Sequence, residues 1–159
     1  FRALFFASQV ATTRLLDVIR EEHGLTYSIQ CAAVPSSSYD GNGCFFAIFT
    51  ADPGKAAEAS KLTKKVMLDL VANPPTDKEM QSVAAQLENL IETQMRQPQF
   101  WTQVLGDMRT NGRDINEVKD LVTNYTSLTK ERITEVLASY LSEDRFFEVI
   151  ATPPVKKEE

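Results

Sequence analysis

The fold turns on residues 20–28, REEHGLTYS, where a helical pattern ends and a strand pattern begins. A helix over residues 3–20 is predicted by apolar side chains at helical spacing, namely Leu4, Ala7, Ala11, Leu15, Val18 and Ile19. Its opposite face is polar and carries Gln9, Thr13 and Asp17. Gly24 ends the helix, because glycine adopts the left-handed conformation that many helix C-termini need. A strand then follows over residues 25–34, LTYSIQCAAV.

A second strand is predicted over residues 44–51, CFFAIFTA. Pro35 ends the first strand, and the intervening SSSYDGNG contains two dipeptides, Asp-Gly and Asn-Gly, that favour turns. The two strands should therefore pair as an antiparallel hairpin with a long loop.

Helices dominate the rest of the chain. Asp52 and Pro53 are good residues for a helix start, Thr76 and Glu79 form a capping box, and Pro98 and Thr129 begin further helices. The expected helices cover about 52–72, 76–96, 98–111, 116–124 and a stretch after Thr129. Residues 145–152, RFFEVIAT, predict a third strand, and residues 153–159 a solvated tail. The expected core against the hairpin includes Leu62, Val66, Leu87, Ile91, Val104 and Ile133.

This order of elements predicts an α+β two-layer sandwich, in which an antiparallel sheet packs against several helices. We expect one domain over residues 1–152. Three strands make a small sheet, so either upstream strands are missing or an open edge pairs with another chain, for example in a dimer. The chain opens with a helical pattern and no initiator Met, which indicates a fragment of a longer polypeptide.

Composition excludes several classes of protein. The formal charge is 17 − 22 = −5 and no stretch is markedly basic, so the electrostatic footprint of a nucleic-acid-binding protein is missing. No apolar run approaches the roughly 18–20 residues that span a membrane. Hydrophobic residues make up 43% of the chain, as expected for a soluble globular protein.

The motifs give little catalytic chemistry. His23 is the only histidine, which excludes zinc motifs with two histidines on one helix and favours a solvated turn residue. Cys31 and Cys44 lie in neighbouring strands and could approach each other, but two buried free thiols are the favoured interpretation. Phe100 and Trp101 are expected in the core.

The segment TRLLDVIREEHGLTYS closely resembles part of the insulinase/pitrilysin-type zinc metallopeptidases, the inverzincins. In that family a helix ending in Leu-Arg-Glu precedes Gly-Leu-x-Tyr-Ser, here residues 24–28. Residues 49–91 resemble the family's next strand and two helices, and residues 100–141 resemble the C-terminal helices of its bacterial members. The final TPP, residues 152–154, matches the usual end of the domain.

The resemblance implies a non-catalytic C-terminal domain of a larger peptidase. The family's zinc motif, His-x-x-Glu-His, lies in an N-terminal domain, and nothing in this chain corresponds to it. No cofactor is therefore expected here, and zinc belongs to the parent enzyme's N-terminal domain. In the pitrilysin-like branch the C-terminal domain supplies an arginine and, seven residues later, a tyrosine to the active site. Arg20 and Tyr27 have that spacing. The family's domain also normally begins with strands, which are absent here.

The expected partners are a catalytic domain, in the same polypeptide or in a partner subunit, and a peptide substrate. Two alternatives remain: an inactive scaffold of the same fold, and a free-standing domain that recruits a peptide to its open sheet edge. A bacterial origin, in the periplasm or the cytoplasm, is the expectation that the resemblance gives for localisation.

Overall fold

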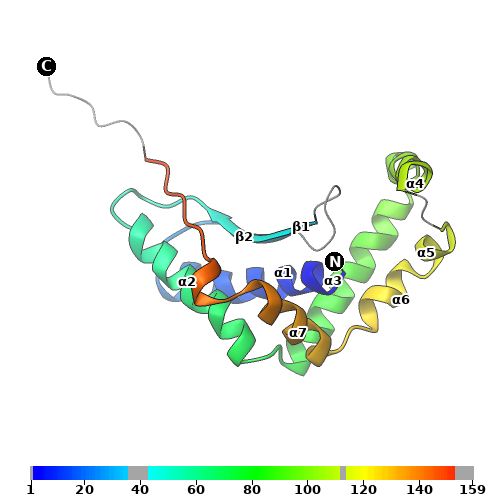
Figure 1. The fold of residues 1–159 in the computed structure, drawn as a ribbon. Helices are drawn as coiled ribbons and strands as arrows, with labels where there is room; N and C mark the ends of the chain where they lie inside the picture. Colours follow the sequence, from blue (N-terminus) through cyan, green and yellow to red (C-terminus); the bar gives the residue numbers. More distant parts are fainter. Residues whose placement is uncertain (1, 36–42, 112–113, 153–159) are drawn as a thin grey trace, which may run out of the picture.

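The computed structural model describes residues 2–35, 43–111 and 114–152, and the expected hairpin turn at 36–42 and tail at 153–159 lie outside them (Figure 1). The elements in chain order are α1 (Arg2–Leu15), the π-helical segment η1 (Leu16–Glu22), β1 (Ile29–Pro35), β2 (Gly43–Phe49), α2 (Ala56–Ala72), α3 (Asp77–Met95), α4 (Pro98–Asn111), α5 (Asn116–Lys119), α6 (Leu121–Thr126), α7 (Lys130–Tyr140) and the 3₁₀ turn η2 (Glu143–Arg145).

Helix α1 is the centre of the molecule. It packs against β1, and it also contacts α2, α3, α6 and α7 (Figure 1). Its sequence explains this position, because apolar residues occupy most of its circumference and seven of them are buried: Ala3, Leu4, Phe6, Ala7, Val10, Ala11 and Leu15. An antiparallel sheet against a helical layer confirms the predicted α+β class.

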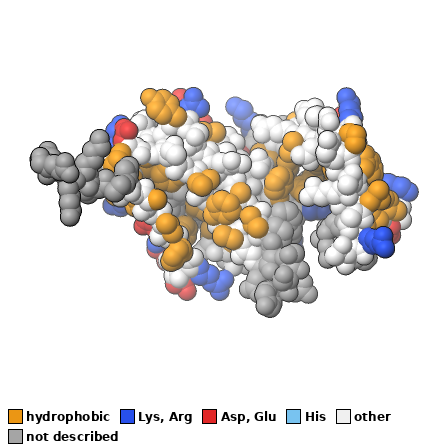
Figure 2. Space-filling view, turned by 90° about the horizontal axis from the view of Figure 1, so that it is seen from above, with side chains coloured by type: hydrophobic (Ala, Val, Ile, Leu, Met, Phe, Trp, Pro, Cys, Tyr) orange, Lys and Arg blue, Asp and Glu red, His pale blue; other side chains and the backbone are white. Residues whose placement is uncertain are grey.

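The hairpin presents one face to α1 and the other to solvent. Ile29 lies opposite Phe49 and Cys31 opposite Ala47, and the side chains of Ile29 and Cys31 are buried. The outer face carries the exposed apolar side chains of Val34, Phe46 and Ile48. Figure 2 looks down on the molecule from above Figure 1 and shows hydrophobic side chains gathered there.

The two cysteines lie on opposite faces of this hairpin. Cys31 is buried and Cys44 is exposed, and both are free thiols. Burial raises the pKa of the Cys31 thiol to about 12. The expectation of two free thiols is confirmed, but the expected burial of Cys44 is wrong, because this residue falls on the solvent-facing side of β2.

The expected capping signals hold at two helices and fail at one. The Thr76 hydroxyl accepts from the Glu79 N–H and the Glu79 carboxylate accepts from the Thr76 N–H, the predicted capping box. Thr129 likewise caps α7 by accepting from the Arg132 N–H. Helix α2 begins at Ala56 rather than at Asp52, because the Pro-Gly pair first makes a turn in which the Lys55 N–H donates to the Asp52 carbonyl at 2.8 Å.

The expected core is correct near α1 and wrong near α4. Leu87 and Ile133 belong to the main cluster, with Leu62 and Val66 packed against it. Ile91 is buried as expected but lies outside that cluster, and Val104 is only half-buried, because α4 packs chiefly on the end of α3.

Trp101, on α4, was expected in the core but is 37% exposed. Its indole N–H donates to the Met95 carbonyl at 2.7 Å, and its ring meets Phe100 edge-on at 5.3 Å. Both contacts are local, so Trp101 closes the α3–α4 corner and lies outside the core.

The expected third strand at residues 145–152 is absent from the structure as described. Residues 143–145 form η2, and the described residues beyond it, 146–152, pair with no strand. Phe146 packs on the core and lies under the Lys64 ammonium, whereas Phe147 is 91% exposed. The segment is rich in aromatic and β-branched residues, but a strand also needs a neighbour for its main-chain hydrogen bonds.

Candidate functional site

Arg20 lies near the end of η1 with its side chain 51% exposed. Its Nε lies 3.4 Å from Oε1 of Glu21, which is also exposed, so this pair contributes little to stability. Within the described part of the chain, no other side chain pairs with this guanidinium. Its terminal nitrogens can therefore donate to an acceptor on another molecule.

The π-helical geometry of η1 was not predicted by the sequence, which indicated a regular helix through residue 20. The segment ends where Gly24 adopts a φ of 59°. The Gly24 N–H donates to the Arg20 carbonyl at 3.0 Å, and the Leu25 N–H donates to the Ile19 carbonyl at 2.9 Å. Glycine at this position is the predicted helix stop, and it reverses the chain into β1.

The turn after Gly24 is fixed by Thr26, which is buried. Its hydroxyl donates to the Thr50 carbonyl at 2.6 Å and accepts from the Ser28 N–H at 3.3 Å. These bonds join the approach to β1 with the end of β2, so the main chain on both sides of Tyr27 is held.

Tyr27 is 93% exposed, although it lies between buried Thr26 and the start of β1. Among the described residues nothing accepts a hydrogen bond from its hydroxyl. The ring of a tyrosine is usually buried, because burial removes a large apolar area from water. A rigid turn that holds this ring in solvent suits contact with another molecule.

The residues of this site do not fit a zinc ion. His23 is exposed and lies where η1 ends, and within the described ranges no three histidine, cysteine, aspartate or glutamate side chains are grouped so that they could hold a metal.

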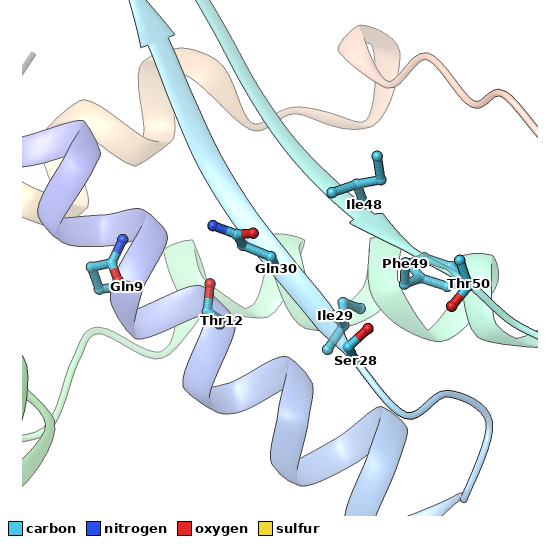
Figure 3. A pocket seen from close by; sticks show the side chains of 8 residues that line it. All are labelled: Gln9, Thr12, Ser28, Ile29, Gln30, Ile48, Phe49 and Thr50. Carbon is cyan, nitrogen blue, oxygen red and sulfur yellow. The ribbon is translucent and has the colours of Figure 1, made fainter.

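A groove of about 470 Å³ lies beside the candidate site, between α1 and the hairpin (Figure 3). Its polar lining consists of Gln9, Thr12, Ser28, Gln30 and Thr50. Figure 3 shows Gln9 and Thr12 on α1 facing β1, with Gln30 extending from β1 toward α1. Ser28 lines the groove and directly follows Tyr27 in the chain, so the groove lies next to the exposed tyrosine.

This groove was not predicted from the sequence. Gln9 was expected on a polar helix face, and Gln30 and Ser28 had no predicted role. One signal was present: Gln30 interrupts the otherwise apolar run of residues 29–34, and side chains alternate between the two faces of a strand. Gln9 and Gln30 line the same groove because α1 packs beside β1, and this packing cannot be predicted from a single sequence.

The family comparison gives a clear result. The model described as the peptidase M16 inactive domain matches residues 4–87, more than half of the 159 residues. No curated protein matches the chain. No described helix is long and apolar enough to cross a membrane.

Two solved structures are similar in fold. A peptidase M16 inactive domain from Pseudomonas fluorescens has a TM-score of 0.78 and 21% identity, over 91% of this chain and 35% of that one. The periplasmic protease PqqL from Escherichia coli has a TM-score of 0.70 and 18% identity, over 88% of this chain and 15% of that one. The chain thus spans about a third or less of these structures.

The matched residues include α1 from Leu4 onward, the hairpin, α2 and the first half of α3, together with Arg20 and Tyr27. The match confirms the resemblance seen in the sequence, and the family's own description calls the domain inactive. The chain therefore belongs to the family of peptidase M16 inactive domains.

Proposed function

We propose that this chain is an accessory domain of a zinc-dependent peptidase. It helps to enclose a peptide substrate and supplies Arg20 and Tyr27 to the active site of a separate catalytic domain. Family membership supports the accessory role. The observation that carries the assignment of residues is Tyr27, 93% exposed on a turn held by Thr26.

The chemistry of the two side chains suits this role. A guanidinium offers several donors in a planar fork, and a phenol offers one short O–H donor. Both can donate to a substrate carbonyl and to the oxyanion that develops from it. Donors that are already in place when that charge forms lower the barrier most.

The zinc ion belongs, in this proposal, to the catalytic domain. That domain is part of the same polypeptide or of a partner subunit. The metal-ligating residues of this chain support placing zinc in the catalytic domain, since the single histidine is solvent-exposed at a helix end.

The test is Tyr27→Phe in the full-length protein, with kcat and KM measured on a peptide substrate. The phenyl ring keeps its shape and only the hydroxyl is lost. If the hydroxyl acts on the transition state, kcat/KM should fall by about 10²–10³ while zinc content and circular dichroism stay constant. Arg20→Lys should also lower kcat/KM, because an ammonium lacks the planar fork.

Tyr140→Phe and Arg132→Lys are matched controls, since both residues lie on α7 and Arg132 is exposed. They should leave kcat/KM within about twofold of the unmodified protein. Unchanged kinetics for Tyr27→Phe and Arg20→Lys would remove the two residues from the active site.

A further inference from the structure

We infer that the groove between α1 and the hairpin binds the uncharged main chain of an extended peptide through the carboxamides of Gln9 and Gln30. The inference rests on the proposed function in taking this peptide to be substrate. It concerns a different set of residues from Arg20 and Tyr27, and it makes no claim about the chemical step.

The edge of β1 beside the groove has unpaired main-chain groups. The Cys31 N–H donates to the Thr12 hydroxyl at 2.9 Å, so Cys31 turns its main-chain groups away from β2. In an antiparallel pair this direction alternates along the strand. Ile29, two residues earlier and part of the groove lining, therefore also turns its N–H and C=O toward the groove.

The Thr12 hydroxyl itself is occupied. It accepts from Cys31 and donates to the Ser8 carbonyl at 2.8 Å. This arrangement occupies the Cys31 N–H and leaves the main-chain groups of Ile29 open, so an extended segment can pair with β1 at its beginning, next to Ser28 and Tyr27.

The polar side chains of the groove are neutral and available. Within the described ranges, the side chains of Ser28, Gln30 and Thr50 have no hydrogen-bond partner, and Gln9 uses only its Nε2, which donates to Ser8 Oγ at 3.3 Å. Each carboxamide offers one acceptor oxygen and an NH₂ donor, which complement the N–H and C=O of a peptide group.

The groove is lined by uncharged side chains, which favours an uncharged ligand. None of the eight residues that line the groove is ionisable, so a charged ligand group would lose hydration without gaining an opposite charge. A peptide main chain is neutral and rich in donors and acceptors. The exposed side chain of Ile48 adds an apolar surface for one side chain of the peptide.

The volume of the groove agrees with this occupant. About 470 Å³ lies within the range of roughly 300–1,000 Å³ found for small-ligand sites. A short extended segment fits there, with its chain continuing past Ser28 toward Tyr27. The groove thus sets the register of a peptide relative to the two side chains of the proposed function.

The experiment measures binding of the fluorescein-labelled, C-amidated peptide Thr-Val-Ala-Val-Thr-Ala to the full-length protein by anisotropy, with a chelator present to prevent metal-dependent cleavage. Gln30→Met keeps the length of an exposed side chain and removes its hydrogen bonds. It should weaken binding about five- to tenfold, as should Gln9→Met. The control Gln81→Met, on α3 and outside the groove, should bind like the unmodified protein.

A second probe separates main-chain from side-chain recognition. The same peptide with alternate amide nitrogens methylated keeps every side chain but loses N–H donors, and it should bind at least about fivefold more weakly. No binding of the first probe, equal binding of the methylated peptide, or unchanged affinity in Gln30→Met and Gln9→Met would each overturn the inference.

The two proposals fail separately. Gln30→Met should raise KM and leave kcat, whereas Tyr27→Phe should lower kcat without weakening the binding of the probe. Silent kinetics in Tyr27→Phe with weakened binding in Gln30→Met would reject the active-site role and keep the groove. The opposite pair of results would reject the groove alone.

Discussion

Arg14 on α1 binds both carboxylate oxygens of Glu79 on α3, with Nε 2.6 Å from Oε1 and Nη2 3.0 Å from Oε2. The same guanidinium donates to the carbonyls of Asn73 and Pro74, where α2 ends. Glu79 also accepts from the main chain of Thr76 and so completes the α3 capping box. One partly buried ion pair therefore joins α1, the helix that leads into the candidate site, to α3 and to the end of α2.

A double-mutant cycle with Arg14→Met and Glu79→Gln should give a coupling energy of about 1–3 kcal/mol, because bidentate charged hydrogen bonds are stronger than neutral ones. The free energy of unfolding is measured in urea by circular dichroism. The exposed pair Arg132–Glu135 within α7 is the control and should couple by less than about 0.5 kcal/mol. Equal coupling energies in the two pairs would mean that the bidentate geometry of Arg14 and Glu79 adds nothing to the free energy of unfolding.

Low pH should reduce the free energy of unfolding of this chain, and part of the reduction should come from protonation of Glu79. Its hydrogen bond to Arg14, together with those from Thr76, lowers the pKa of this carboxyl to about 2 against the opposing effect of burial. The pKa in the unfolded chain is near 4.5, so between these values the unfolded state binds more protons and stability falls as pH falls.

The contribution of Glu79 should be complete above about pH 5 and mostly lost near pH 2. We expect it to be about 1–2 kcal/mol, less than the full pKa change implies, because the carboxylate is partly exposed. The difference in unfolding free energy between the unmodified chain and Glu79→Gln should therefore shrink from pH 6 to pH 2.5. A difference that is constant across this range would contradict the lowered pKa.

Leu87→Ala should cost about 2–5 kcal/mol of unfolding free energy, because its side chain is 2% exposed in the core and truncation leaves a cavity. Leu90, on the same helix, is 43% exposed, and Leu90→Ala should cost less than about 1 kcal/mol. Similar losses in the two variants would show that the buried face of α3 is misassigned.

Gly24→Ala should cost about 1–2 kcal/mol, because φ is +59° there and a side chain at that angle is strained. No atom lies within 4 Å of an added Cβ at Gly24 or at Gly54, so neither change creates a clash. Gly54→Ala is therefore a control for the backbone effect and should stay within about 0.5 kcal/mol. A silent Gly24→Ala would mean that the turn tolerates another conformation.

The sequence was informative at three places where a local signal decides the structure. The stop at Gly24, the capping box at Thr76 and the N-cap at Thr129 each depend on residues within one turn, and all three are present. The exposed phenol of Tyr27 was picked out only through the spacing of a family motif. Composition alone favoured an ordinary packed tyrosine.

Features that depend on distant residues were missed. Residues 145–152, rich in aromatic and β-branched side chains, predicted a strand, but a neighbouring strand decides whether one forms. Trp101 looked like core because its ring is large, yet α4 reaches only the end of α3. The groove beside Ser28 exists because α1 lies along β1, and that packing depends on the whole core.

Trp101 also decides what optical spectroscopy reports about this chain. It is the only tryptophan, and its indole is bonded at the α3–α4 corner. Its emission therefore follows the opening of that corner, which can precede loss of the buried cluster around α1. Agreement between emission and backbone dichroism on denaturation would indicate a single cooperative unit. An earlier emission change would assign the corner a lower local free energy of opening.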